Sequence, residues 1–194
     1  MMARQKEFDQ DKALDKAMTL FWQKGYEATS IQELVDHMGI GRRSLYDTFK
    51  SKHDLFIDAL DRYREMAFES TVTSDEPLVS PKASIQEIFE EIVAEAVADR
   101  NRKGCFIVNS AVELAGQDDA VTIRSREGFQ TLEFIFHRLL HQAQQSGELS
   151  TDHDIQALAQ FLMNAVFGIR VMSKVNPDKL VLTNVVNLTL SILD

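Results

Sequence analysis

The chain has 194 residues, enough for a small module and a larger domain with its own core, and a formal net charge of −9. Its single cysteine excludes an internal disulfide framework and fits a reducing compartment. No apolar run approaches the roughly 18 residues of a membrane span, and the opening residues, MMARQKEFDQDK, lack the pattern of a signal peptide. We therefore expect a cytoplasmic protein without a membrane partner.

Residues 29–55 have the pattern of a short helix, a tight turn, a second short helix and the capped start of a third. Ser30 followed by Glu33 predicts a capping box. Gly39 stands where the first of these helices must end and turn. The next helix begins with three polar residues and spaces two apolar residues for packing inward: Arg42, Arg43 and Ser44, then Leu45 and Phe49. This is the arrangement of a helix-turn-helix.

The segment resembles the N-terminal DNA-binding domain of the TetR family of bacterial transcriptional regulators. The residues that carry the resemblance are Ala13, Ala17, Phe21, Gly25, Tyr26, Thr29–Ile31, Gly39–Gly41, Leu45, Tyr46, Phe49, Ser51 and Lys52. The long helical patterns already predict an all-α fold. The resemblance implies three helices for DNA binding and about six for effector binding and dimerisation. We expect the first domain at residues 1–50 and the second at 51–194.

Arg42 and Arg43 open the recognition helix, where a guanidinium can bind guanine with two hydrogen bonds. The alternative for Arg43 is an ion pair with Asp47 on a solvated surface. Thr29, Tyr46 and Lys52 match family positions that hold the DNA backbone. The residues expected to contact double-stranded operator DNA are Thr29, Arg42, Arg43, Ser44, Tyr46, Lys50 and Lys52.

The acidity of the chain is confined to its second part. Residues 1–50 contain eight Lys or Arg and eight Asp or Glu, so all nine excess negative charges follow residue 50. Four basic residues cluster around the recognition helix: Arg42, Arg43, Lys50 and Lys52. A local basic patch can bind phosphates on an acidic protein, with a binding constant that depends steeply on salt.

Beyond residue 50 the pattern predicts long helices with clear boundaries. Ser51 caps the first of them, and Pro177 stands in the first turn of the last. The predicted helices span about residues 52–71, 82–99, 118–145, 152–174 and 177–193, with a polar loop at 74–81 and a small-residue segment at 104–114.

The last two helices have wide apolar surfaces, and in the resembled family these helices pair with their copies across a dimer interface. A homodimer also fits two operator half-sites about one helical turn apart. The expected interface residues are Leu158, Leu162, Ala165, Ile169, Val181, Val185 and Leu188. Ordinary core within one chain is the alternative for each of them.

The resemblance also implies a largely apolar cavity for a small-molecule effector, which the sequence leaves unidentified. The residues expected to line it are Cys105, Asn109, Phe129, Phe136, Phe161, Asn164, Phe167 and Lys174. Packing in an ordinary helical core is the alternative for the phenylalanines.

Cys105 is the most specific of these candidates. The segment from Gly104 to Asn109 resembles one in a TetR branch that includes sensors of electrophiles and oxidants. In that branch a lysine of the next-to-last helix can lie near this cysteine, and Lys174 has the comparable position. A position near a helix N-terminus favours a nucleophilic thiolate. The alternative is a small buried hydrophobic residue.

The sequence lacks a phosphate-binding glycine loop, a nucleophile elbow and a zinc signature, so we expect no enzyme and no cofactor. Glu133, His137 and His141 have a spacing that can bind metal, but they flank an apolar stripe and we expect no metal site. The predicted function is a transcriptional repressor released from its operator by a small molecule. One alternative is a redox- or electrophile-sensing repressor switched through Cys105, and another is a helical small-molecule-binding protein without DNA function.

Overall fold

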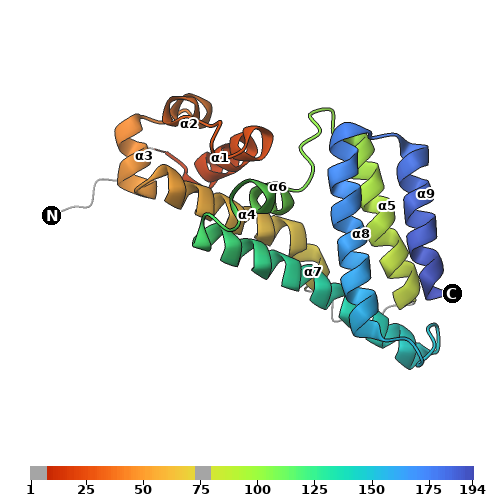
Figure 1. Cartoon of the computed structure of the whole chain (residues 1–194). Helices are drawn as coiled ribbons and strands as arrows, with labels where there is room; N and C mark the ends of the chain where they lie inside the picture. Colours follow the sequence, from red (N-terminus) through yellow and green to blue (C-terminus); the bar gives the residue numbers. More distant parts are fainter. Residues whose placement is uncertain (1–7, 73–79) are drawn as a thin grey trace.

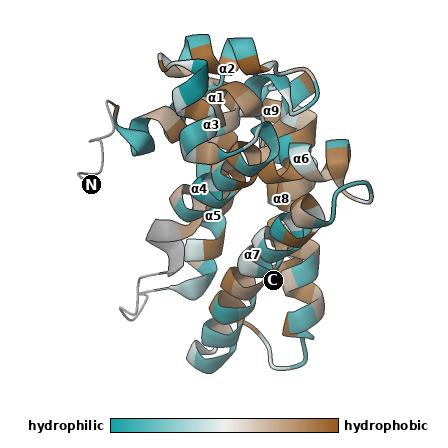
Figure 2. Ribbon diagram, turned by 90° about the vertical axis from the view of Figure 1, so that its left-hand side faces the viewer, coloured by the Kyte–Doolittle hydropathy of each residue, from teal (hydrophilic) through white to brown (hydrophobic). Residues whose placement is uncertain are grey.

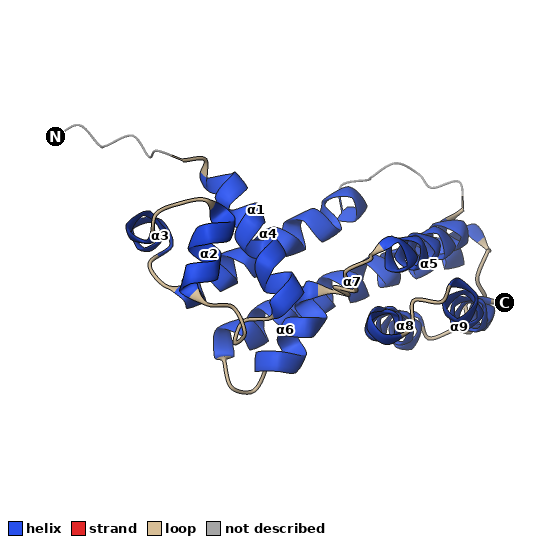
Figure 3. Cartoon of the chain, turned by 90° about the horizontal axis from the view of Figure 1, so that it is seen from above, coloured by secondary structure: helices blue, strands red, loops and turns tan. Residues whose placement is uncertain are grey.

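A computed structural model describes residues 8–72 and 80–194, and within these residues all regular structure is helical (Figures 1 and 3). The helices are α1 (Gln10–Lys24), α2 (Ile31–Met38), α3 (Arg42–Phe49), α4 (Lys52–Val72), α5 (Pro81–Ala98), α6 (Phe106–Leu114), α7 (Asp119–Ser146), α8 (Ile155–Val175), α9 (Lys179–Leu190) and the short 3₁₀ helix η1 (Ser191–Leu193). The all-α prediction is confirmed. Most of the loop predicted at 74–81 lies outside the described residues.

Local capping signals set several helix boundaries. The Ser30 hydroxyl accepts from the Glu33 backbone N–H at 3.2 Å, and the Glu33 carboxylate accepts from the Ser30 N–H at 2.9 Å, so the predicted capping box is present. Gly39 ends α2 in the left-handed conformation, at φ 72°. The Ser51 hydroxyl accepts from the Asp54 N–H at 2.9 Å and caps α4 as predicted.

The start of α9 differs from the prediction. The Asp178 carboxylate accepts from the Val181 backbone N–H at 2.9 Å and is the N-cap of this helix. Pro177 therefore lies outside the helix and not in its first turn. An aspartate directly before the helix provides the side-chain acceptor that a proline lacks.

Two clusters of buried apolar side chains hold the helices together. The first cluster joins α1, α2 and α3 to α4, α6 and the start of α7, around Phe21, Leu45 and Phe56. The second cluster fills the space between α5, α7, α8 and α9, around Phe89 and Phe136. The helices before residue 50 thus share their core with later helices, and the domain boundary expected at that residue stays a prediction.

Helix α7 connects the two clusters because it contributes residues to both. Hydrophobic and hydrophilic residues alternate along it, as expected of a helix that buries one face (Figure 2). Its first half lies beside α4 (Figure 1), where Arg124 pairs with Asp61 at 2.9 Å and Arg64 pairs with Glu127. Helices α1–α3 and the C-terminal helices are therefore joined through continuous packing.

Candidate DNA-binding surface and effector cavity

The segment α2–turn–α3 presents a polar face to solvent. Leu34 in α2 and Leu45 in α3 are fully buried and anchor the two helices to the first core cluster. With α3 fixed in this way, Arg42, Arg43 and Tyr46 are exposed on its outer side. These are the side chains that a recognition helix needs on its surface to reach the major groove.

Among the residues that the structure describes, the two arginines of α3 have only weak partners. Arg43 Nε lies 3.6 Å from Asp47 Oδ2, and the two side chains are 92% and 69% exposed. Such an exposed pair contributes about 0.3–0.5 kcal/mol, so binding to DNA can replace it. The Arg42 guanidinium lies 5.9 Å from the centroid of the Tyr46 ring.

The other predicted contacts lie along and after α3. Ser44 is half-buried in the first turn of α3. Lys50 is exposed and ends α3 with a φ of 64°, in the left-handed region. Lys52 Nζ lies 4.2 Å from the centroid of the Tyr26 ring, and this cation–π contact orients the first residue of α4.

Thr29, which was expected to hold the DNA backbone, is buried in the protomer. Its side chain is fully buried, and its hydroxyl donates to the Gly25 carbonyl at 2.6 Å. Its backbone N–H donates to the Tyr26 carbonyl at 3.2 Å. Thr29 therefore closes the α1–α2 turn from inside, and the neighbouring exposed residue is Ser30. We correct its expected role from a DNA contact to a structural one.

A cavity of about 150 Å³ lies between α4, α5, α6, α7 and α8. Of the eight residues predicted to line an effector pocket, Cys105, Phe129 and Phe167 line this cavity. The rings of Phe129 and Phe167 pack against each other with centroids 4.4 Å apart. Cys105 is the N-cap residue of α6. The structure thus brings together residues from three separate segments.

The polar end of the cavity contains residues that the sequence analysis did not assign to a site. Arg170 in α8 donates from Nη2 to Glu95 Oε2 at 2.6 Å, and both residues line the cavity. Tyr63 in α4 also lines it, and burial, followed by the proximity of Cys105, raises the pKa of the Tyr63 hydroxyl well above its ordinary value. The sequence signal for this end was an arginine in the middle of an apolar stretch of α8.

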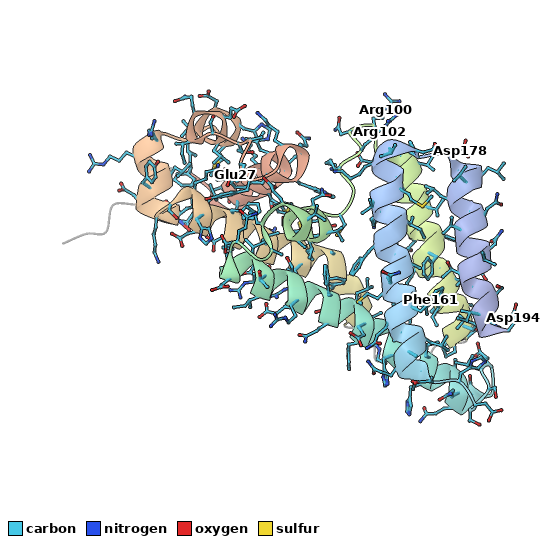
Figure 4. All side chains as sticks on the ribbon, viewed as in Figure 1. Glu27, Arg100, Arg102, Phe161, Asp178 and Asp194 are labelled. Atoms are coloured by element: carbon cyan, nitrogen blue, oxygen red, sulfur yellow. The ribbon has the colours of Figure 1, made fainter. Side chains whose placement is uncertain are left out.

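Two of the predicted phenylalanines have other roles. Phe136 is fully buried in the second core cluster and stacks on Phe89, with ring centroids 5.8 Å apart. Phe161 is 44% exposed on α8 (Figure 4), and Asn164, one turn further along, is also exposed. Neither residue of α8 lines the cavity, because their side of the helix faces away from the core.

Asn109 and Lys174 hold the loop that precedes Cys105. Asn109 Nδ2 donates to the Lys103 carbonyl at 2.7 Å, and Lys174 Nζ donates to the same carbonyl at 3.0 Å. They position the backbone two residues before the cysteine and do not line the 150 Å³ cavity. The predicted proximity of Lys174 to Cys105 therefore takes the form of a contact with the loop.

The same loop contacts the DNA-binding helices. Trp22 Nε1 in α1 donates to the Gly104 carbonyl at 3.0 Å. The Trp22 ring also packs edge-on against Tyr63 at 4.9 Å, and Lys103 Nζ lies 4.0 Å from the centroid of the Trp22 ring. A residue of the cavity wall and the residue next to Cys105 thus both contact one side chain of α1.

Glu113, near the C-terminal end of α6, makes a second connection to the DNA-binding helices. Its carboxylate accepts from the backbone N–H groups of Tyr26 at 3.0 Å and Glu27 at 2.8 Å. Gly25 permits this approach, because a Cβ there would lie 2.7 Å from Glu113 Oε2 and because its φ is +85°. We refer to these contacts as the Glu113 clamp.

Two family models match the chain. The model for bacterial regulatory proteins of the tetR family matches residues 13–59, and a tetracyclin repressor-like C-terminal domain matches residues 81–188. The chain belongs to the TetR family.

Similar proteins agree with this membership. An uncharacterized HTH-type transcriptional regulator, YezE of Bacillus subtilis (strain 168), is 38% identical over 195 residues and covers 100% of both chains. The HTH-type transcriptional repressor ComR of Escherichia coli (strain K12) is 35% identical over 88% of this chain and 82% of its own. A cysteine mutant of the TetR family regulator CifR, solved with 26 bp operator DNA, is 29% identical, with a TM-score of 0.85 over 99% of this chain and 100% of its own. The TetR-family chain is therefore a helix-turn-helix transcriptional regulator.

The residues expected at a TetR dimer interface divide between the inside and the outside of the protomer. Three are buried in its own core: Leu158, Leu162 and Ile169. Two are partly buried against that core: Ala165 and Val185. Val181 and Leu188 are 37% and 77% exposed. The three buried leucine and isoleucine side chains are therefore ordinary core, which was the alternative. We correct their expected role at the dimer interface.

An exposed apolar face nevertheless runs along α8 and α9, which lie side by side (Figures 1 and 3). We call it the outer face, and its large apolar residues are Phe161, Val171, Met172, Val175, Leu180, Val181, Leu188 and Ile192. Helix α8 has apolar residues on both of its sides. By length and composition alone, it could cross a membrane. One of those sides packs on the second core cluster.

Proposed function

We propose that this TetR-family regulator is a homodimeric cytoplasmic repressor that releases its operator when a small molecule occupies the cavity beside Cys105. The observation that supports this proposal is the position of α6. Its N-cap, Cys105, lines the cavity, and Glu113 near its other end binds the α1–α2 turn. The relatives support the proposal, since ComR is named a repressor and the CifR mutant was solved with operator DNA.

Dimerisation through the outer face supports operator binding. A single recognition helix contacts one half-site, and a two-fold pair of them matches two half-sites about 34–36 Å apart. Exposed apolar residues of this number are unusual on a monomer surface. Gly168 stands among them, and a Cβ there would meet no atom within 4 Å, so a partner helix has room to approach closely.

Release follows from the contacts between the cavity and α1. An occupant that moves Tyr63 or Cys105 moves the neighbours of Trp22, and with them the end of α1 that the Glu113 clamp also holds. The occupant then favours the arrangement of the two recognition helices that does not fit the operator. A coupling free energy of about 2–3 kcal/mol would weaken operator affinity roughly 30- to 150-fold.

The double variant Arg42→Ala/Arg43→Ala tests the DNA-binding surface. We expect it to lose roughly 100-fold or more in operator affinity, because each arginine contact to a base is worth about 1–3 kcal/mol. The measurement is fluorescence anisotropy of the full chain with an operator selected from random DNA, over a series of salt concentrations. The slope of the logarithm of the binding constant against log salt is expected to become shallower, because fewer phosphate charges are neutralised.

A charge-matched variant, Arg100→Ala/Arg126→Ala, is the control for this test. Both of its arginines are exposed and lie outside α3; Arg100 is in the loop between α5 and α6 (Figure 4). It changes the net charge equally but is expected to bind the operator nearly as the wild type does. If both double variants lose the same operator affinity, the arginines of α3 contribute only through their general positive charge.

A second candidate mechanism is a covalent switch at Cys105, favoured by its position on the cavity wall beside Tyr63. The thiol S–H would add across the carbon–carbon double bond of an α,β-unsaturated ketone, with sulfur bonding the β-carbon and the proton ending on the α-carbon. Because the chain has one cysteine, a single adduct by mass spectrometry identifies the site.

The Cys105→Ser variant separates the two mechanisms. Under the covalent mechanism, methyl vinyl ketone releases the wild type from its operator and leaves Cys105→Ser bound, since a hydroxyl is a far weaker nucleophile than a thiolate. The measurement is anisotropy before and after incubation, with apo operator affinity as the check on folding. Equal release of both proteins contradicts the covalent mechanism and leaves reversible occupancy.

A further inference from the structure

The polar end of the cavity contains the hydrogen-bond donors of Arg170. Arg170 has a largely buried side chain, 19% exposed, and carries five N–H groups. Among the described residues only Glu95 accepts a hydrogen bond from that side chain, at 2.6 Å. Since Arg170 lines the cavity, its remaining donors are available to an occupant. Donors in such an environment bind most strongly to a charged or strongly polar acceptor.

Tyr63 lines the cavity near Arg170 without adding a negative charge. Its hydroxyl interacts with the Cys105 side chain and with the Phe106 backbone, and burial raises its pKa. The hydroxyl is therefore neutral at neutral pH. The carboxylates of Glu91 and Glu95 belong to exposed residues and form the rim. Glu95 pairs with Arg170 at 2.6 Å, so the guanidinium lies directly beside one of these two carboxylates.

The remaining walls are apolar, and the space is small. The rings of Phe129 and Phe167 and the side chains of Ile92 and Leu132 surround a volume of about 150 Å³. An apolar cavity of that volume holds benzene, so an occupant has roughly six to ten non-hydrogen atoms. Gly128 allows Ile107 to pack directly against α7, because a Cβ there would lie 2.7 Å from Ile107 Cδ1.

We infer that the cavity takes a compact, mostly apolar molecule with one carbonyl or carboxylate oxygen that accepts hydrogen bonds from Arg170. This inference rests on the proposed function, since it names the effector class for the same cavity. A polyhydroxylated molecule is disfavoured by the apolar walls, and a multi-ring compound by the volume.

Isothermal titration calorimetry of the full chain with three probes of one shape tests the inference. The probes are benzoate, benzamide and toluene, which present a carboxylate, a neutral carbonyl and no oxygen. We expect benzoate or benzamide to bind at least about tenfold more tightly than toluene, as a hydrogen bond to a charged group allows. The order of benzoate and benzamide distinguishes an anionic effector from a neutral one.

Substitution of Arg170 identifies the group responsible. Arg170→Gln is expected to weaken binding of the preferred oxygen probe by about 10- to 100-fold and to leave toluene unchanged. Arg170→Lys keeps the charge and should retain part of the affinity, while Arg126→Gln, at an exposed site outside the cavity, should change nothing. Thermal melts and apo operator binding verify that each variant is folded.

Three results would overturn the inference. The first is toluene binding as tightly as both oxygen probes. The second is no binding of either oxygen probe up to about 10 mM, the limit of very weak affinity. The third is unchanged affinity in a folded Arg170→Gln. A separate anisotropy measurement tests the proposed function independently of this inference. A probe that binds through Arg170 without releasing the operator contradicts the release mechanism but supports the inferred ligand class.

Discussion

The Gly168→Arg variant is expected to be a folded monomer that no longer binds operator DNA specifically. Gly168 lies within α8 on the outer face, where an added Cβ meets no atom of the described residues within 4 Å, and arginine is a better helix former than glycine. The protomer should therefore keep its stability, while a charged side chain enters the proposed contact with the partner's α8 and α9. Loss of dimerisation removes the second half-site contact, and we expect affinity to fall at least about 1000-fold, to the non-specific level.

Sedimentation velocity and anisotropy measure the two effects on the same sample. Gln130→Arg, at an exposed position of α7, adds the same charge away from the outer face and should remain dimeric. A Gly168→Arg protein that sediments as a dimer would place the interface on another surface. A monomer that still binds the full operator with wild-type affinity would remove the need for a dimer altogether.

The Phe136→Ala variant is expected to lose about 3–5 kcal/mol of unfolding free energy, the usual cost of removing a buried phenylalanine. Phe136 is fully buried and stacks on Phe89, so the truncation leaves a cavity among side chains of α5, α7, α8 and α9. Urea denaturation followed by circular dichroism measures the change. Because the protein is proposed to be dimeric, all variants are compared at one protomer concentration.

Phe134→Ala is the matched control, two residues away on the same helix. Phe134 is 60% exposed, so its truncation should cost no more than about 0.5 kcal/mol. If Phe136→Ala loses little unfolding free energy but no longer binds the effector, Phe136 lines the effector cavity, as first expected from the sequence. A large loss with a normal response to effector is the result that the packing predicts.

Features set by neighbouring residues could be predicted from the sequence. The capping box of Ser30 and Glu33 and the turn at Gly39 depend on contacts within a few residues. The α9 boundary was misplaced because Pro177 and Asp178 both give a helix-start signal, and only the carboxylate supplies an acceptor for an N–H of the first turn.

Features that depend on which side of a helix faces inward could not be predicted. Helix α8 is apolar on both sides, so spacing alone does not distinguish the buried Leu162 from the exposed Phe161. The expected interface was therefore partly assigned to core residues, and Phe161 was assigned to the cavity. The environment of Thr29 depends likewise on the fold of the α1–α2 turn, which no local pattern specifies.

The cavity itself joins residues far apart in the sequence. Tyr63, Cys105 and Arg170 come from α4, the start of α6 and α8, and each has an ordinary explanation when read alone. The phenylalanines of the cavity were identified by residue type, but their polar neighbours become visible only when the helices are packed together.

The Glu113 clamp has a consequence for how such regulators diversify. Glu113 binds backbone N–H groups, which every residue except proline provides, and it needs a specific residue only at Gly25. The side chains at 26 and 27 are not what the carboxylate recognises, and the base-reading residues of α3 do not take part. Mutations that change the operator specificity of α3 therefore leave the Glu113 clamp intact. Under the proposed mechanism, α3 and the cavity can therefore change separately while the contact between α6 and the α1–α2 turn is kept.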